Sequence, residues 1–474
     1  MTHTAIGWDP GGREWTTRPS GAAVPAPPLA GDLLVVAAAR EAASRDLGRL
    51  VTRRPSAVLR PAEVDDIAKM VRLCHDHAIP VAAQGTRHQT NGQALAPDGL
   101  VIDMTSLNTI HRADGDRADS DAGVLWSDLA ATLAGSGLRF AGGLTGYVPL
   151  SVGGTLSAGG ISPNFEAGAQ IDFVERIQVV TGRGEVVWAS EAENRKLFAA
   201  ALGGLGQAGI ITRAELVVAP MPAWVHSWVL PHPGIDGAFA AMRALISGGL
   251  ATEVYCMIVP PGPTFLVHAA WYEYADGAPP PDVPGRLGWA GPVQHEVSGY
   301  LDHVLKYSAI IDQWRQAGWD ERRKPWFDVF LPGSRVREFV GATLDRMTPL
   351  DWSAPHGEGF VLLFPHRASA FRRPRLRLPR PEPDGLVWLF DVLNAAEHDA
   401  DAGYAEAMLV RNREWIADAT AAGGVVYPIG THGFTAADWQ RHYGDDWEDV
   451  VRAKRLFDPA LILAPGQGIT AAVR

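Results

Sequence analysis

One histidine stands in a glycine-punctuated loop where a side chain could do chemistry. His88 lies in the stretch VAAQGTRHQTNGQ, after one apolar run and before another, with Gly85 and Gly92 on either side. Glycine is favoured where the backbone adopts positive φ or approaches a partner closely. The pattern fits either a capping or solvent-exposed histidine, or a histidine that touches a bound molecule.

Three glycine-rich stretches follow one another in this part of the chain, at 85–92, 153–168 and 203–209. Backbone N–H groups in such loops can form a concave anion site that suits a pyrophosphate. The usual dinucleotide fingerprint is absent, because GGLGQAG follows an expected helix and precedes an expected strand. Each stretch alone is typical of tight turns, whereas the three together favour a dinucleotide site outside a Rossmann frame.

The elements that must position these loops begin near Arg53. Strand-like runs (SAVLRP, IPVAAQG and GLVIDM) flank AEVDDIAKMVRLCHDHA, in which apolar residues recur at helical spacing. VERIQVVTGRGEVVWAS has the alternation of a hairpin. Between about Trp224 and Tyr427, runs such as TFLVHAAWYEY and GLVWLFDVL alternate with helical patterns, which indicates a second region built on an antiparallel sheet. The expected fold class is α+β.

Bulk composition argues against several classes of function. The 474 residues are more than one core usually holds, and the net charge of −11 argues against a nucleic-acid or anionic-membrane partner. Two cysteines, Cys74 and Cys256, are too few for a disulfide framework or a cysteine zinc site, and no His, Asp and Glu spacing indicates a metal. The N-terminus lacks the basic and apolar regions of a secretory signal, so we expect a cytoplasmic protein. The oligomeric state stays open.

The ordered motifs are similar to those of FAD-binding flavoproteins of the vanillyl-alcohol oxidase (PCMH-type) superfamily, most of all cytokinin dehydrogenases. RPSAVLRPAEVDDIAKMVRLC resembles the first strand and helix of the FAD domain, and VAAQGTRHQTNGQA resembles its Gly-Arg-Gly-His-Ser loop. SVGGTLSAGGIS and NRKLFAAALGGLGQAGIITRAEL resemble the pyrophosphate and adenine side of the cofactor site. KPWFDVFLPGS and FDPALILAPGQGI resemble parts of the substrate domain and of the C-terminal return. The match keeps this order over nearly the whole chain after residue 50.

The resemblance implies two domains. We expect a lead-in over residues 1–50, an FAD-binding domain of two α/β subdomains over 51–222, and a substrate domain over 223–429 in which helices flank an antiparallel sheet. Residues 430–474 are expected to return to the FAD-binding domain. The implied activity is that of an FAD-dependent oxidoreductase, an oxidase or dehydrogenase that takes hydride from a small organic substrate onto flavin N5. Oxygen or another acceptor would then reoxidise the flavin.

By position, the resemblance assigns His88 to the histidine that bonds covalently to the 8α-methyl group of the flavin. A covalent imidazole anchors the ring system and raises its potential. Related enzymes add a second, cysteinyl link where this chain has Tyr147, so a single link is expected. Arg87 and Gln89 replace smaller residues of the family loop. The expected FAD contacts are Gln84, Gly85, Thr86, Arg87, His88, Gln89, Gly92, Gln93, Gly153, Gly154, Thr155, Ser157, Gly160, Ile161, Gly209, Ile211 and Gln467.

The catalytic base of cytokinin dehydrogenases is missing from this sequence. Those enzymes carry an aspartate seven residues before the first glycine of the GGTLS motif, where this chain has Gly146, which argues against cytokinin as the substrate. The candidates for a replacement role are Tyr147, Asp302, Asp391 and Asn394. Asp391 and Asn394 stand within the apolar run LVWLFDVLN, where a polar side chain needs a partner, so they either face solvent or serve the site.

Three functions stay open on the sequence. The first is FAD-dependent oxidation of an amine, an alcohol or a secondary-metabolite intermediate. The second is a catalytically degenerate flavin-fold protein that binds a ligand without turnover. The third is a true cytokinin dehydrogenase with a relocated base. Reduction of the flavin by candidate substrates in the absence of oxygen separates the first and third from the second.

Overall fold

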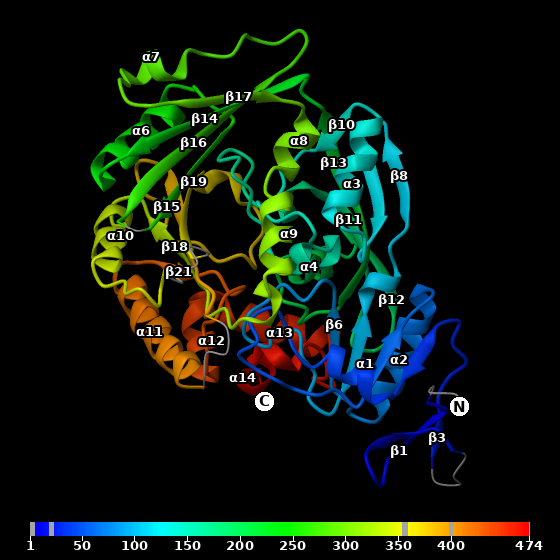
Figure 1. The fold of residues 1–474 in the computed structure, drawn as a ribbon. Helices are drawn as coiled ribbons and strands as arrows, with labels where there is room; N and C mark the ends of the chain where they lie inside the picture. Colours follow the sequence, from blue (N-terminus) through cyan, green and yellow to red (C-terminus); the bar gives the residue numbers. More distant parts are fainter. Residues whose placement is uncertain (1–4, 19–22, 261, 353–358, 398–401, 474) are drawn as a thin grey trace.

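The structure, a computed structural model, describes residues 5–18, 23–260, 262–352, 359–397 and 402–473. Its N-terminal part forms a three-stranded antiparallel sheet, ordered β2-β1-β3, that projects from the main body (Figure 1). The strands are β1 (Gly7–Asp9), β2 (Glu14–Thr16) and β3 (Val24–Pro25). Trp8 and Trp15 pack edge to face at 5.1 Å between ring centroids, and this contact buries one side of the small sheet.

A four-stranded sheet, ordered β4-β5-β7-β6, carries the loop of His88 at one edge. Its elements are β4 (Asp32–Leu34), β5 (Ala57–Arg60), β6 (Val81–Gln84), β7 (Leu100–Asp103), α1 (Ala37–Ala42) and α2 (Val64–Asp76). β5, β7 and β6 run parallel, which requires a crossover such as the one that α2 provides between β5 and β6. The helical spacing is confirmed, because α2 buries Ile67, Met70 and Cys74 in the core.

The next sheet has six antiparallel strands in the order β12-β11-β13-β9-β8, with β10 paired to β13. Its elements are β8 (Ile110–Asp114), β9 (Arg117–Asp121), β10 (Leu138–Phe140), β11 (Val174–Val180), β12 (Val186–Ser190), β13 (Ile210–Pro220), α3 (Trp126–Gly135), α4 (Val152–Ala158) and α5 (Arg195–Ala201). The expected hairpin is confirmed by the pairing of β11 with β12. The N–H groups of Gly203 and Leu205 donate to the carbonyls of Leu156 and Ser157, so the second and third glycine stretches lie side by side.

The largest sheet has eight antiparallel strands in the order β17-β14-β16-β15-β19-β20-β18-β21. The strands are β14 (Trp224–His232), β15 (Glu253–Val259), β16 (Thr264–Glu273), β17 (Gln294–Ser298), β18 (Phe327–Pro332), β19 (Phe360–Arg367), β20 (Leu386–Leu393) and β21 (Val425–Val426). The helices are α6 (Ile235–Ser247), α7 (Val283–Leu287), α8 (Tyr300–Leu305), α9 (Ser308–Gln316), α10 (Val336–Leu344) and α11 (Ala402–Ala421). Helices α6, α10 and α11 cover the outer face, whereas α8 and α9 stand between this sheet and the rest of the molecule (Figure 1). The α+β prediction is confirmed.

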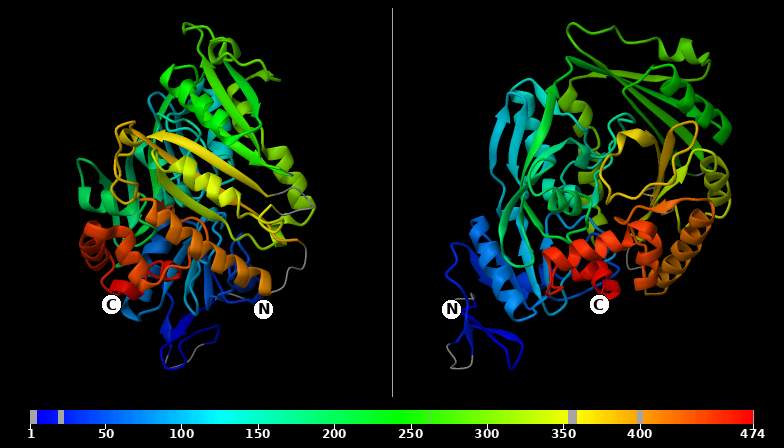
Figure 2. Two further views of the ribbon diagram at one scale, coloured as in Figure 1. Left: turned by 90° about the vertical axis from the view of Figure 1, so that its left-hand side faces the viewer. Right: turned by 180° about the vertical axis from the view of Figure 1, so that it is seen from behind.

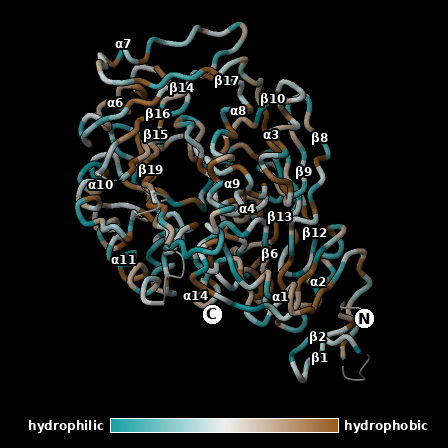
Figure 3. The backbone as a smooth tube through the Cα atoms, viewed as in Figure 1, coloured by the Kyte–Doolittle hydropathy of each residue, from teal (hydrophilic) through white to brown (hydrophobic). Residues whose placement is uncertain are grey.

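Alternation along β18 and β20 divides their side chains between the two faces of the sheet. Val329 and Phe390 belong to the core under the outer helices. Asp328 and Asp391, one residue away on each strand, point to the opposite face. Hydrophobic segments follow the strands and the outer loops are mostly hydrophilic (Figure 3), so two carboxyl groups in this inner position are an exception that calls for an explanation.

The last part of the chain returns to the four-stranded sheet (Figure 2). Its helices are α12 (Ala436–Tyr443), α13 (Trp447–Phe457) and α14 (Ile469–Val473). The N–H of Val81 donates to the carbonyl of Ile462, and the N–H of Ala464 donates to the carbonyl of Val81, both at 2.8 Å. A buried ion pair between Lys454 and Asp458, at 2.8 Å, stands at the base of this returning segment. Residues 462–464 therefore extend the sheet beside β6 and the His88 loop.

Candidate active site

A cavity of about 580 Å³ lies between the glycine-rich loops and the inner face of the eight-stranded sheet. Its size is within the usual range for a bound organic molecule. One wall is formed by the loops around His88, Gly153 and Gly209, and by Gln467 of the returning segment. The opposite wall comes from β15, β18, β19 and β20, together with α8 and α9. Residues from both halves of the chain thus enclose one space.

The His88 loop is held by hydrogen bonds to the chain behind it. Gln84 Nε2 donates to the carbonyls of Ala43 (3.1 Å) and Ala94 (2.9 Å), and Asp46 Oδ2 accepts from the N–H of Gly92 at 2.5 Å. Arg87 adopts a φ of 58° and bonds through its guanidinium to a backbone carbonyl of α1. The bulky Arg87 side chain is therefore accommodated by contacts outside the cavity, even though the family loop has glycine there.

The imidazole of His88 is half-buried between two aromatic side chains. It stacks on Tyr147 at 4.1 Å with an angle of 14° between the rings, and it meets Trp326 edge on at 5.4 Å. Burial, together with the charges of Lys324 and Arg315, lowers the pKa of His88 to about 3. The imidazole is therefore neutral at ordinary pH, and its unprotonated nitrogen has the lone pair that a nucleophile needs.

Most of the expected cofactor contacts surround this cavity. Those that line it are Gly85, Thr86, Arg87, His88, Gln89, Gln93, Gly153, Gly154, Thr155, Ser157, Gly160, Ile161, Gly209, Ile211 and Gln467. Gln84 and Gly92 are not among the lining residues and instead support the loop from behind. The sequence pattern could not separate Gln84 and Gly92 from the lining residues around His88, because all of them belong to the same loop.

The cavity wall fits a nucleotide cofactor. The buried Oε1 atoms of Gln89 and Gln467 find no hydrogen-bond partner among the described residues, so a bound group with N–H or O–H donors would satisfy them. At Gly160, with a φ of 73°, a Cβ would overlap Gln170 Oε1. Glycine here therefore lets two wall segments meet closely.

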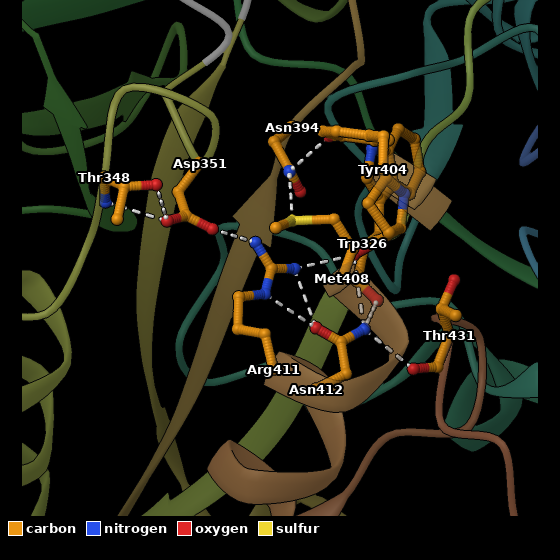
Figure 4. Close-up of polar contacts among 10 residues, drawn as sticks. Trp326, Thr348, Asp351, Asn394, Tyr404, Met408, Arg411, Asn412 and Thr431 are labelled. Atoms are coloured by element: carbon orange, nitrogen blue, oxygen red, sulfur yellow. Dashed lines mark hydrogen bonds and ion pairs between the residues drawn. The ribbon is translucent and has the colours of Figure 1, made fainter. Parts of the chain in front are cut away.

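The four predicted catalytic residues are not brought together. Tyr147 and Asp391 line the cavity. Burial is the main cause that raises the pKa of Tyr147, whose hydroxyl accepts a hydrogen bond from the guanidinium of Arg315, so the phenol keeps its proton at neutral pH. Asp302 is exposed on α8 and does not line the cavity. Asn394 is buried at the end of β20, where its Nδ2 donates to Tyr404 Oη at 3.0 Å (Figure 4).

Asp328, which was not predicted, lies directly opposite Asp391 in the register of β18 and β20. Asp328 Oδ2 and Asp391 Oδ1 are buried and receive no hydrogen bond from an N–H or O–H group in the described ranges. Burial raises the pKa of Asp328 to about 7, and burial with the neighbouring Asp328 charge raises the pKa of Asp391 well above its ordinary value. The sequence did carry a sign of Asp328: in the run FDVF, an aspartate interrupts an apolar strand, as Asp391 does in LVWLFDVLN.

A second polar group occupies the part of the cavity near α8. The Glu253 carboxylate accepts hydrogen bonds from His303 Nε2 at 2.8 Å and from the Tyr272 hydroxyl. Burial opposes its ionisation, but the attraction of His303 prevails and lowers the pKa of Glu253 to about 2. The Lys306 ammonium lies over the ring of Tyr307 at 5.3 Å. Glu253 is thus an ionised, fully paired carboxylate.

A buried network on α11 supports the wall that carries Asp328 (Figure 4). Arg411 pairs with Asp351 and donates to Asn412 Oδ1. Asn412 Nδ2 donates to the carbonyls of Pro325, Trp326 and Thr431, which lie at the start of β18 and in the segment after β21. The Thr431 hydroxyl continues to Thr90 Oγ1 at 2.9 Å, two residues after His88. The network therefore links α11 to both walls of the cavity.

Metal sites, membrane spans and cysteine pairing can also be checked in the described ranges. Within them, no group of three or more His, Cys, Asp or Glu side chains is placed to hold a metal ion. In the same part of the chain, no helix is both long and apolar enough to span a bilayer. Both cysteines, Cys74 and Cys256, are buried free thiols.

Comparisons with known proteins agree with this architecture. Residues 55–190 match the FAD binding domain family, and residues 292–470 match the family described as cytokinin dehydrogenase 1, FAD and cytokinin binding. Cytokinin dehydrogenase 8 of Oryza sativa subsp. indica is 30% identical over 497 residues, which cover 90% of each chain. An uncharacterized oxidoreductase of the fasciation locus of Rhodococcoides fascians is 29% identical over 433 residues, covering 90% of this chain and 95% of the relative.

A solved structure shows the same fold. The 6-hydroxy-D-nicotine oxidase of Arthrobacter nicotinovorans superposes with a TM-score of 0.71 at 22% identity, covering 94% of this chain and 97% of the other. Together with the matched families and the extended identity to cytokinin dehydrogenases, the cavity wall supports FAD as the cofactor. The chain is an FAD-dependent oxidoreductase and belongs to the cytokinin dehydrogenase family.

Proposed function

We propose that the protein oxidises a small organic amine or alcohol in the cavity between the glycine loops and the eight-stranded sheet. The observation that carries this proposal is the single cavity, because it joins the predicted FAD contacts to a separate, mostly apolar wall. Bound FAD would supply a two-electron acceptor that takes hydride at N5. The glycine loops, Gln93 and Gln467 would hold and orient the cofactor.

His88 is proposed as the covalent anchor of the flavin. Its imidazole is neutral and lines the cavity, which suits attachment to the 8α-methyl group. Tyr147 stacks on His88 in the place where related enzymes carry a second, cysteinyl link, so a single bond is proposed. Acid precipitation tests this: a yellow pellet containing flavin is expected from the wild type. In the control variant His88→Ala, we expect a colourless pellet and free FAD in the supernatant.

The substrate wall favours a flat apolar body with one polar group. Trp314, Trp319 and Phe360 line it together with aliphatic side chains of β19 and β20. Among its buried acidic groups, Asp328 and Asp391 have no ion-pair partner in the described ranges, whereas Glu253 is paired with His303. An amine next to a ring fits this wall, because the ring can pack on the aromatic side chains and the amine can bind the carboxyl groups. Cytokinins and 6-hydroxy-D-nicotine, which name relatives of this chain, are therefore proposed as starting points for a substrate panel.

Anaerobic reduction of the flavin tests the proposed function. The purified protein is mixed with amines, alcohols, a cytokinin and 6-hydroxy-D-nicotine, and the flavin absorbance is followed. Bleaching by at least one compound is expected. Admitting oxygen or an artificial quinone then distinguishes an oxidase from a dehydrogenase. A flavin that no compound of the panel reduces would favour a binding protein without turnover.

A further inference from the structure

Oxidation of an amine or alcohol to an imine or carbonyl removes a proton as well as a hydride. The position that carries an aspartate in cytokinin dehydrogenases is Gly146 here, and a Cβ at Gly146 would meet no described atom within 4 Å. The cavity wall is therefore open at this point, and the proton needs an acceptor elsewhere. This inference rests on the proposed function of the same site.

Three other groups in the cavity, Tyr147, His88 and Glu253, are poor proton acceptors. Tyr147 keeps its phenolic proton at neutral pH because its pKa is raised, and the pKa of His88 is lowered to about 3 by burial and by nearby positive charges. Glu253 is ionised, but His303 and Tyr272 already occupy its oxygens. A carboxylate with a pKa of about 2 holds a proton weakly, so it has little driving force to take one from a substrate.

Asp328 and Asp391 differ from these groups because one buried oxygen of each carboxyl, Asp328 Oδ2 and Asp391 Oδ1, has no N–H or O–H donor in the described ranges. Residues opposite each other in an antiparallel pair have Cβ atoms about 4.5–5.5 Å apart, which brings the two carboxyl groups together. Neither carboxyl forms an ion pair with a described lysine, arginine or histidine. Two adjacent carboxylates in a buried site cannot both be ionised at low cost, and a shared proton removes that repulsion.

The pair lies beside the predicted flavin anchor. Trp326, two residues before Asp328, contacts the His88 imidazole. Tyr427 donates through its N–H to the carbonyl of Asp328, and its hydroxyl accepts from the N–H of Gly160 at 3.0 Å. The backbone of Asp328 is thus tied to both the His88 loop and the second glycine stretch.

We infer that Asp328 and Asp391 share one proton and that the ionised member is the catalytic base that accepts the proton lost by the substrate. Bound FAD would supply the acceptor for the hydride and its two electrons. The N–H or O–H bond breaks, its electron pair forms the C=N or C=O double bond, and the proton moves to the carboxylate oxygen. The pair then holds two protons and returns one to solvent before the next turnover.

The shared proton can be measured without substrate. The holoenzyme is prepared with 13C-carboxyl aspartate, and isotope-edited infrared spectra are recorded for the wild type and for Asp328→Asn/Asp391→Asn. A protonated-carboxyl band is expected at neutral pH in the wild type. Burial also raises the pKa of Asp46 to about 7, so the contribution of the pair is the part of the band that is lost in the double variant and kept in Asp345→Asn, which changes an exposed carboxyl of the same domain. Flavin absorbance and thermal unfolding check that the double variant folds.

Kinetics on the same proteins test the acceptor role. Anaerobic flavin reduction should slow by about 100-fold or more in the double variant, as expected for loss of a general base. Each single Asn variant keeps one carboxyl with no neighbour to share a proton, so the upper of the pair's two apparent pKa values should be replaced by a single lower one in its pH–rate curve. A double variant that keeps the whole wild-type band overturns the shared proton. A double variant that reduces flavin as fast as the wild type overturns the acceptor role while the proposed function stands. A wild-type flavin that no substrate reduces overturns the proposed function itself.

Discussion

Lys454→Met removes one half of a buried ion pair at the base of the C-terminal return. The Lys454 ammonium and the Asp458 carboxylate are both 0% exposed and lie 2.8 Å apart, and the ammonium also donates to the carbonyl of Leu463. Removing one partner of such a pair costs about 3–5 kcal/mol, because the other charge stays buried without compensation. Asp458 keeps two backbone donors, the N–H groups of Ile462 and Leu463. We therefore expect the free energy of unfolding to fall by about 3 kcal/mol, at the lower end of this range.

Urea unfolding followed by tryptophan fluorescence measures this loss. The matched control is Lys69→Met, because Lys69 forms an ion pair with Asp65 at the same i,i+4 spacing and at 2.7 Å. That pair is 29% and 61% exposed, and solvent screens it, so its removal should leave the unfolding curve close to that of the wild type. The reasoning is refuted if Lys454→Met and Lys69→Met unfold at the same urea concentration.

Three further substitutions test other parts of the site. Gly160→Ala forces a side chain into a φ of 73° and onto Gln170, at a cost of about 1–2 kcal/mol for the backbone alone, and equilibrium dialysis should show weaker FAD retention. Asn412→Leu removes a donor from three backbone carbonyls, but Pro325 keeps a hydrogen bond from Arg411 and Trp326 keeps one from the N–H of Thr431. The carbonyl of Thr431 loses its one donor among the described residues, at about 1–3 kcal/mol, and thermal unfolding should show the loss. Glu253 has a folded pKa of about 2, below its ordinary 4.5, so its contribution to stability is present above pH 4.5 and is lost as the pH falls toward 2. The difference in unfolding free energy between wild type and Glu253→Gln should therefore shrink over that range.

Local patterns account for the parts of the fold that could be predicted. The spacing of Ile67, Met70 and Cys74 is a property of consecutive turns, so the helix that they define was recognisable without tertiary information. The partner of Asp391 was not recognisable in this way. Asp328 is more than sixty residues away, and only the register of β18 against β20 makes them neighbours.

The pairing of residues 462–464 with β6 sets an order of events during synthesis. His88 leaves the ribosome about 380 residues before Gln467, which at about 5–20 residues per second is an interval of about 20–80 s. During that interval, the edge of β6 and the loop beside it have no C-terminal neighbour. A nascent chain therefore cannot enclose the flavin, and cofactor capture becomes a step of the finished polypeptide. The time at which the holoenzyme forms would then depend on the concentration of free FAD in the cell and on release of the C-terminus. It would not depend on how fast the first sheet folds.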